Sequence, residues 1–257
     1  NSLGKAMEGS KSTNKKFYEN YSTKFKNQNL IYSESEYIQW SRATATRLRG
    51  WLPKKTNSRI LDVGCGHGNL LFMFRFMGYD NIEGIDISFE QVSIARNQGF
   101  EVHHGDALEL MNSTREKRYS LITAFDFVEH LTKKEAIIFL EATRACLEDG
   151  GNLVLQLPNA AAPRGMHFQA SDITHETFFG PSSIKQLLLS TGFSDIEIRE
   201  VSVVNTGWHL GPIPLNPKRL IQKILWFGVK TAYKLRDYAE GYGQKIYTRN
   251  MLVSAKK

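Results

Sequence analysis

The chain has 257 residues, 41% of them hydrophobic and 23% charged, which is the size and composition of one globular domain with a full core. No stretch reaches the roughly 18 continuous apolar residues of a spanning helix, and residues 1–10 lack the apolar core of a secretory signal, so we expect neither. The formal net charge of +7 favours anionic partners, and the presence of only two cysteines favours a reducing compartment. We therefore expect a cytoplasmic protein, with peripheral contact to the inner face of a membrane left open.

Strands and helices alternate along the chain from residue 59 onward. We expect helices within residues 15–52, then strands at residues 59–63, 81–85, 101–104, 120–124, 151–157, 194–201 and 251–255, and helices at residues 69–77, 89–97, 133–146 and 182–190. Strands that alternate with helices of this length predict βαβ units and a parallel sheet. Ligands of such sheets bind at the carboxyl ends of the strands, so the loops after the strands are where we expect chemistry.

The loop after the first of these strands is rich in glycine. It contains Gly64, Gly66 and Gly68 in a G-x-G-x-G pattern that begins two residues after Asp62. Glycines here allow the backbone to turn tightly and to approach a ligand closely. A dinucleotide-binding fingerprint would place glycine or alanine where this chain has Asn69. The loop therefore indicates a ligand without a pyrophosphate and disfavours a nicotinamide-dependent oxidoreductase.

Acidic residues end the next two strands. Asp86 lies 22 positions after Gly64, the distance at which a carboxylate accepts hydrogen bonds from ribose hydroxyls. Asp106 ends the third strand, where it would accept from an adenine amine while Ala107 leaves room for the ring, or would cap the following helix. The sequence leaves both interpretations of Asp106 open.

Together, these motifs resemble those of the class I S-adenosylmethionine-dependent methyltransferases, and of their small-molecule branch in particular. The segments that carry the resemblance are residues 60–68, 84–88, 105–107, 125–131 and 147–151. The resemblance implies a Rossmann-like α/β fold with a seven-stranded sheet, mostly parallel with an antiparallel last strand, and helices on both faces.

The same resemblance implies that the cofactor is S-adenosyl-L-methionine, with S-adenosyl-L-homocysteine as its product. The cofactor-binding residues that it implies are Asp62, Gly64, Cys65, Gly66, Gly68, Asp86, Ile87, Asp106, Ala107 and Phe125. Among these, Asp62 would lie close to the amino group of the cofactor's methionyl part.

The expected organisation is one catalytic domain with two additions. We expect an N-terminal helical cap at residues 1–52, the methyltransferase domain at residues 53–204 and 245–257, and an amphipathic helical insertion at residues 205–244. Within the insertion, residues 218–236 place apolar side chains on one broad arc of a helix, with lysines and arginines beside it. Such a helix packs on the domain or across a dimer, lies at a lipid interface or closes over substrate, and the sequence leaves these interpretations open.

Transfer of a methyl group from a sulfonium to an alcohol or phenol needs alignment of the reacting atoms and removal of a proton. The candidate catalytic bases are His130, in the loop after the fourth strand, and His175, in the loop after the fifth. Histidine acts as a general base near neutral pH. The structural alternatives are a hydrogen-bonding role for His130 and a turn or helix-start position for His175.

Asp126, Glu129, His130 and His175 also have the oxygen and nitrogen ligand types that divalent ions take. The D-x-x-E-H spacing resembles the E-x-x-E-H arrangement of metal-dependent RNA 2′-O-methyltransferases and some quinone-pathway O-methyltransferases. Here the shorter Asp126 replaces the first glutamate, which weakens the match. We therefore assign no metal ligands and keep a divalent metal as the alternative that is not favoured.

The expected function is S-adenosylmethionine-dependent methyl transfer to a hydroxyl of a small molecule, a sugar or a lipid- or nucleotide-linked glycan intermediate, as in polysaccharide biosynthesis. The loop after the fourth strand, the basic charge and the insertion favour this function. The alternatives are a metal-dependent RNA 2′-O-methyltransferase, a quinone-precursor O-methyltransferase, an N-methyltransferase of an amino sugar and a binding protein without turnover. The expected partner is a small-molecule acceptor, phosphorylated or lipid-linked, whereas nucleic acid is not expected because the sequence has no RNA-binding module.

Overall fold

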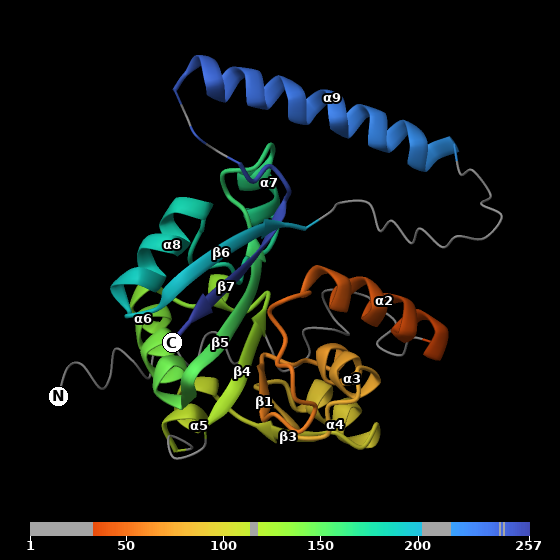
Figure 1. Cartoon of the computed structure of the whole chain (residues 1–257), viewed down its shortest axis with the longest axis vertical. Helices are drawn as coiled ribbons and strands as arrows, with labels where there is room; N and C mark the ends of the chain where they lie inside the picture. The colour runs from red at the N-terminus through yellow and green to blue at the C-terminus, as the bar shows by residue number, and fades with distance from the viewer. Residues whose placement is uncertain (1–32, 114–117, 202–216, 242, 244) are drawn as a thin grey trace.

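The computed structural model describes residues 33–113, 118–201, 217–241, 243 and 245–257. They form a seven-stranded sheet with helices around it (Figure 1). The strands are β1 (Ile60–Val63), β2 (Ile82–Asp86), β3 (Glu101–His104), β4 (Tyr119–Phe125), β5 (Leu147–Pro158), β6 (Ser194–Glu200) and β7 (Asn250–Lys256), in the order β3-β2-β1-β4-β5-β7-β6. Neighbouring strands are parallel except where β7 lies antiparallel between β5 and β6. The expected Rossmann-like sheet with an antiparallel last strand is therefore confirmed.

Helices cover both faces of the sheet. On one face lie α5 (Ala107–Ser113), α6 (Lys133–Cys146) and α8 (Pro181–Ser190), and on the other lie α3 (Asn69–Phe76) and α4 (Phe89–Asn97), with α2 (Glu34–Arg47) packed on α3. Successive residues of a strand point to opposite faces. Leu61 and Val63 of β1 therefore pack in the core beneath α5, α6 and α8, and Ile60 packs in the core beneath α3. Both faces of β1 are therefore buried.

Local capping chemistry sets several helix boundaries. Thr132 accepts a hydrogen bond from the N–H of Glu135, whose carboxylate accepts one from the N–H of Thr132, and this capping box begins α6. Ser33 and Glu36 begin α2 in the same way. The structure adds two short elements that the sequence did not predict, the 3-10 helix η2 (Val128–His130) and the helix α7 (Gly165–Gln169), and it gives bounds to α5, for which the sequence offered only a candidate cap at Asp106.

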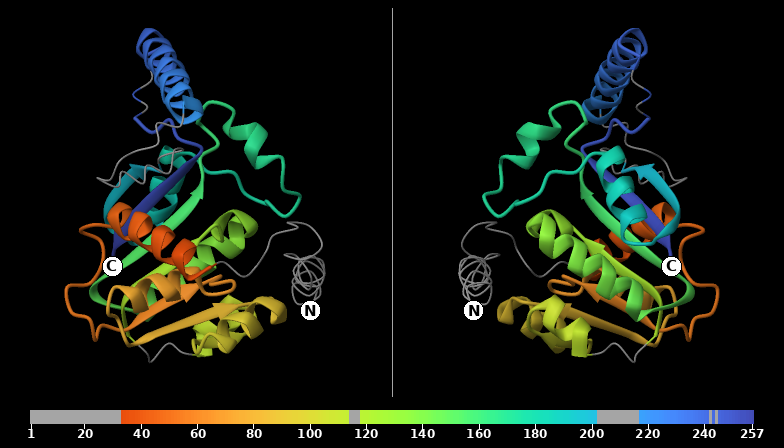
Figure 2. Two further views of the ribbon diagram at one scale, coloured as in Figure 1. Left: turned by 90° about the vertical axis from the view of Figure 1, so that its right-hand side faces the viewer. Right: turned by 90° about the vertical axis from the view of Figure 1, so that its left-hand side faces the viewer.

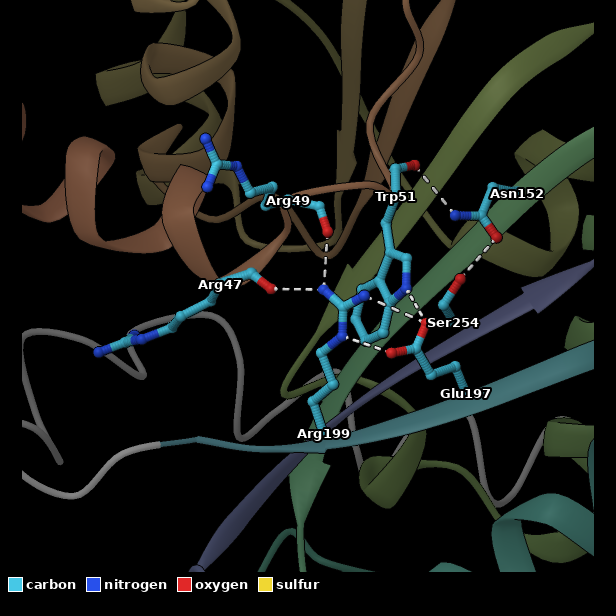
Figure 3. Close-up of polar contacts among 7 residues, drawn as sticks. All are labelled: Arg47, Arg49, Trp51, Asn152, Glu197, Arg199 and Ser254. Carbon is cyan, nitrogen blue, oxygen red and sulfur yellow. Dashed lines mark hydrogen bonds and ion pairs between the residues drawn. The ribbon is translucent and has the colours of Figure 1, made fainter.

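The turn after α2 is fastened to the distant strand β6 (Figure 3). Arg199 donates hydrogen bonds to the carbonyl oxygens of Arg47, at 3.1 Å, and Arg49, at 2.8 Å, and its guanidinium carbon lies 3.8 Å from the centre of the Trp51 ring. The indole N–H of Trp51 donates to Glu197 at 2.8 Å, and Glu197 also pairs with Arg199. These contacts hold the end of α2 against the sheet.

The insertion forms the long helix α9 (Pro217–Ala239), which lies beyond the end of the sheet at one extreme of the molecule (Figures 1 and 2). Two expectations fall outside the described residues, namely helices at residues 15–32 and the first part of the insertion, residues 205–216. Within the described part of the chain, no helix is long and apolar enough to cross a membrane.

Candidate active site

A cavity of about 880 Å³ opens at the carboxyl ends of the central strands. Of the expected cofactor-binding residues, those that line it are Asp62, Gly64, Cys65, Gly66, Asp86, Ile87, Asp106, Ala107 and Phe125. Both candidate bases, His130 and His175, line the same cavity. The fold therefore brings the two groups of expected residues to one place.

The glycine loop turns along the cavity wall in a conformation that side chains would block. Gly64 and Gly66 have φ angles of +69° and +55°, and an added Cβ would lie 2.9 Å from the Phe127 ring at Gly64 and 2.9 Å from the amide oxygen of Gln91 at Gly66. Both positions therefore favour glycine for their backbone conformation, and Gly64 also for space, because the Gln91 amide near Gly66 is the end of a flexible side chain. At the two glycines a ligand can approach the backbone closely.

Asp86 uses both carboxylate oxygens to organise the backbone around it. Oδ2 accepts a hydrogen bond from the N–H of Gly66 at 2.8 Å, and Oδ1 accepts one from the N–H of Ser88 at 2.8 Å. Burial raises the pKa of Asp86, and these two hydrogen bonds act in the opposite direction. The carboxylate thus ties the glycine loop to the end of β2.

Asp62 is a deeply buried acid of the cavity wall, with 2% of its surface exposed. Its Oδ1 accepts a hydrogen bond from the hydroxyl of Thr123 at 2.6 Å. Burial raises the pKa of Asp62 to about 7, the Thr123 hydrogen bond lowers it and the nearby charge of Asp86 raises it further. A cationic group bound beside Asp62 would stabilise its ionised form.

Asp106 caps the helix that follows it. Its Oδ1 accepts from the N–H groups of Leu108, at 2.8 Å, and Glu109, at 3.2 Å, at the start of α5. The capping role that the sequence left open is therefore present, and Asp106 lines the cavity as well.

Gly68 and Cys65 differ from their neighbours in what they contact. Gly68, with φ of +96°, is not among the described residues that line the cavity, and a Cβ added to it would lie 3.1 Å from the ring of Phe100. The Cys65 side chain is buried against Gly84, where an added Cβ would lie 2.7 Å from its sulfur. Gly68 serves the turn into α3, and cofactor contact at this residue stays a prediction.

The hydrogen bonds of His130 fix its tautomer. Nδ1 lies 3.1 Å from the carbonyl oxygen of Thr174 and 2.9 Å from its hydroxyl oxygen. That hydroxyl donates its only proton to Asp172, at 2.6 Å, so it can only accept from His130. Nδ1 of His130 therefore carries the proton, and Nε2 holds the lone pair that a base needs.

His175 stands beside His130, with 4.9 Å between the ring centres. Its Nδ1 donates to the carbonyl oxygen of Gln169 at 2.9 Å, so its Nε2 likewise holds the lone pair. The N–H groups of Glu176 and Thr177 donate to the carbonyl oxygen of Glu129, at 2.8 and 3.0 Å. The loop after β5 is thereby attached to the loop after β4, and the two imidazoles are held together.

Glu129, His130 and His175 each place one potential ligand atom within 4.8 Å of the others. Asp126, which we expected to share such a cluster, is outside this group; it has a φ of +50° and accepts a hydrogen bond from Gln156 at 3.0 Å. The structure therefore offers three potential ligands, of which Glu129 is buried.

Several residues of the cavity wall were not singled out from the sequence. Trp40, Gln91, Phe168, Asp172, Ile173 and Thr174 all line it. Trp40 comes from α2 and Gln91 from α4, and such contacts arise only when distant segments pack together. Asp172 and Thr174 precede His175 by a few residues, so polar neighbours of a candidate base would have been the signal to follow.

Comparison with known families decides the class of protein. The family described as "Methyltransferase domain" matches residues 36–198, more than half of the chain. The chain belongs to this methyltransferase family. It is an S-adenosylmethionine-dependent methyltransferase, as the sequence motifs implied.

Curated relatives carry names of O-methyltransferases. The ubiquinone biosynthesis O-methyltransferase of Aliivibrio fischeri (strain MJ11) is 25% identical over 182 residues, which cover 60% of this chain and 69% of that protein. The 27-O-demethylrifamycin SV methyltransferase of Amycolatopsis mediterranei (strain S699) is 28% identical over 117 residues, 42% of each chain. These relatives act on small molecules.

Solved structures share the fold of this methyltransferase. A SAM-dependent methyltransferase from Archaeoglobus fulgidus has a TM-score of 0.62 at 23% identity and covers 87% of this chain and 97% of its own. The phosphoethanolamine N-methyltransferase 2 of Haemonchus contortus, solved with S-adenosyl-L-methionine, has a TM-score of 0.57 at 15% identity and covers 93% of this chain and 60% of its own.

Proposed function

We propose that this methyltransferase acts on a hydroxyl oxygen of a small acceptor bound beside His130 and His175. The observation that carries the proposal is the pair of imidazoles, each with its proton on Nδ1, in the cavity that also contains the glycine loop. The cofactor supplies a methyl group bonded to a positively charged sulfur. The sulfur leaves as a neutral thioether, so no acid is needed to assist its departure. The protein must then align the acceptor oxygen and take its proton.

We propose that the strand-end residues bind the cofactor. Asp86 keeps lone pairs for ribose hydroxyls, since each carboxylate oxygen can accept more than the one hydrogen bond described here. Asp106 has a second oxygen beyond the one that caps α5. Asp62 is placed to accept from an amino group at the end of β1, and the gain in charge pairing would offset its burial.

We assign the general base to His130. Nε2 would accept the hydroxyl proton, and the resulting imidazolium would keep its Nδ1–H hydrogen bonds to Thr174. Asp172, which accepts from the Thr174 hydroxyl, is a positioning residue that holds this arrangement. His175, at 4.9 Å between ring centres, would orient the acceptor oxygen or share the proton.

A second mechanism is favoured by the proximity of Glu129, His130 and His175. Their potential ligand atoms lie within 4.8 Å of one another, and both histidines donate Nδ1–H to oxygen, a hydrogen bond that orients the ring of a metal-binding histidine. A divalent ion held there would bind and polarise the acceptor hydroxyl. We keep proton transfer to histidine as the main proposal because Asp126, the fourth expected ligand, bonds to Gln156 instead.

The acceptor class is revised from the sequence-based expectation of a sugar or glycan. The cavity is lined by the apolar side chains of Trp40, Phe168 and Ile173, and the carboxylates of Glu129 and Asp172 also line it. Apolar walls suit a flat hydrophobic acceptor, and carboxylates would repel a phosphate. With relatives named for ubiquinone biosynthesis, we propose a hydroxyl of a quinone precursor or similar lipid-soluble molecule first, taken up at the cytoplasmic face of a membrane, and a lipid-linked glycan second.

A transfer assay with radiolabelled S-adenosylmethionine tests this function. The purified chain is offered quinone precursors with one unmethylated hydroxyl, the matched precursors with that hydroxyl already methylated, and lipid-linked glycans. Label should enter only acceptors with the unmethylated hydroxyl, and the methylated matches are the control. Label in an amino group of an acceptor, with none in any hydroxyl, would contradict the proposal.

A further inference from the structure

Seven large apolar side chains of α9 face away from the rest of the protein. They are exposed along the whole described length of the helix: Ile221, Ile224, Leu225, Phe227, Val229, Leu235 and Tyr238. Their exposed fractions run from 41% at Val229 to 86% at Tyr238. At 100° per residue they share one side of the helix, about half of its circumference. An apolar face of this extent on the surface indicates a binding partner.

The opposite side of α9 holds the helix on the protein, and it is largely polar. The half-buried residues recur every three or four positions: Trp226, Lys230, Tyr233 and Asp237. Lys230 forms an ion pair with Glu200 at the end of β6. The pKa of Tyr247 is raised by its burial and then by its hydrogen bond with Asp237. A helix packed on a core would show the reverse arrangement, with the apolar side inward.

We propose that α9 is a membrane-docking helix, whose exposed apolar side inserts into the interface of a bilayer that contains anionic lipid. The 23 residues of α9 include six lysines and arginines and one acid, a net charge of +5. The exposed side chain of Lys234 lies at one margin of the apolar arc, where it would reach lipid headgroups, and Arg236, which pairs with Glu240, lies near the other margin. Basic residues beside an apolar face characterise helices that lie in the plane of an anionic membrane surface.

The position of α9 suits contact with a flat surface. The helix lies at one extreme of the molecule in both orientations, so a bilayer could meet its outer side without meeting the sheet (Figures 1 and 2). At 1.5 Å per residue, a helix of this length extends about 35 Å along such a surface. It lies on the bilayer rather than across it, since no helix of the described residues can span one.

Charge distinguishes a lipid surface from a second copy of the chain. A symmetric dimer formed through α9 would bring two helices of net charge +5 against each other, and like charges would oppose that interface. An anionic bilayer matches both features of the helix, since it offers an apolar interior and negative headgroups. This inference is independent of the proposed acceptor.

Co-sedimentation with vesicles tests the inference without any assay of activity. The whole chain is mixed with phosphatidylcholine vesicles that contain or lack phosphatidylglycerol. We expect binding to the anionic vesicles that falls with salt, and weaker binding to the neutral ones. Leu235→Ser should weaken binding about tenfold, by removing one inserted leucine, and Lys234→Gln about fivefold on anionic vesicles alone.

The matched control is Leu189→Ser, which removes a leucine of similar exposure, 55% against 65%, from α8. It should bind vesicles as the unmodified chain does, and circular dichroism should show unchanged helix content in all variants. Absence of binding to anionic vesicles, or equal binding by the Leu235→Ser and Leu189→Ser variants, would overturn the inference. So would a dimer in sedimentation velocity that Leu235→Ser alone dissociates, because α9 would then be an interface between copies.

Discussion

Asp62 and Thr123 are cross-strand partners in neighbouring strands, and the threonine hydroxyl donates to the aspartate at 2.6 Å inside the protein. Among the described residues, this hydroxyl is the only hydrogen-bond donor to Asp62, a carboxylate whose pKa burial raises to about 7. One uncharged donor offsets part of the cost of burying an ionised group, so the fold holds an acid that titrates near neutrality.

The first prediction concerns the pH dependence of stability. An acid whose pKa is higher in the folded state costs nothing below its ordinary value of 3.8 and destabilises the fold increasingly up to about pH 7. Asp62→Asn keeps an oxygen for Thr123 but does not ionise. Between pH 5 and pH 8 the free energy of unfolding should therefore fall less in the variant, by about 2–3 kcal/mol, as measured by urea denaturation. Asp80→Asn, at an exposed position, is the control, and parallel pH profiles for Asp62→Asn and the unmodified chain would refute the prediction.

The second prediction concerns cofactor affinity. Asp86→Ala should weaken binding of S-adenosylhomocysteine by about 1.5–3 kcal/mol, the scale of hydrogen bonds to a charged group, in titration calorimetry. Asp80→Ala removes an exposed carboxylate and should leave the affinity unchanged. Because Asp86 also holds the N–H of Gly66, thermal unfolding of the variant must be compared in the same buffer. Unchanged affinity in a folded Asp86→Ala protein would remove this residue from the cofactor site.

The third prediction separates His130 from a nearby histidine. His130→Ala should lower turnover by a factor on the order of 10² to 10⁴ while S-adenosylhomocysteine still binds. His167→Ala, an exposed change on α7, should have no effect. Loss of activity with a chelator, restored by Mg²⁺ or Mn²⁺, would assign His130 and His175 to a metal site. Normal turnover in both the His130→Ala and the His175→Ala variants would leave alignment alone to drive the reaction.

The fourth prediction concerns the hydroxyl that orients the base. Thr174→Val removes the hydroxyl that accepts from the Nδ1–H of His130 and donates to Asp172, whereas Thr174→Ser keeps this hydroxyl. The backbone carbonyl of residue 174 stays in both variants. Turnover should fall about tenfold or more in the valine variant and recover with serine, and the pH profile should shift only with valine. Equal activity of the two variants would show that the backbone carbonyl is sufficient.

The fifth prediction concerns the attachment of α2. Arg199→Ala should lower the free energy of unfolding by about 2–3 kcal/mol, because two carbonyls and Glu197 lose a charged partner and Trp51 loses its stacking cation. Arg199→Lys should recover only part of this, since an ammonium cannot reproduce the planar fork. The comparison is Arg236→Ala, which breaks an exposed pair with Glu240 and should change the free energy of unfolding far less. Equal losses from the two alanine variants would contradict the role given to the Arg199 contacts.

The parts of the fold that local chemistry controls were predictable. The bounds of α4, α6 and β3 coincide with the expected ones, and for α6 the capping box of Thr132 and Glu135 is visible in the sequence. The short helix α7 follows Arg164, which adopts a positive φ of 58°, and no sequence pattern marks such a residue. Short elements of this kind depend on the surrounding structure.

The candidate site was predictable where it is made of backbone and strand ends, and less so where it is made of packed side chains. Asp86 is the last residue of β2 and Asp62 is the last but one of β1, so both line the cavity, and the alternation of strands and helices in the sequence predicts these positions. Trp40 reaches the cavity only through the packing of α2, and Asp126 turns to Gln156 because of a backbone conformation that its type does not reveal. The sequence likewise shows that α9 has an apolar side, but only the packing of the helix on the protein decides that this side is exposed.

The position of β7 in the sheet has a consequence for synthesis of the chain. Residues 250–256 pair on one edge with β5 and on the other with β6, so those two strands are not neighbours. While a ribosome is still producing the segment before residue 250, the facing edges of β5 and β6 both present unpaired backbone groups. Such open edges are sites of aggregation. The nascent protein therefore passes through a stage in which the position of β7 between β5 and β6 is not yet filled. Binding of chaperones should be greatest just before β7 emerges.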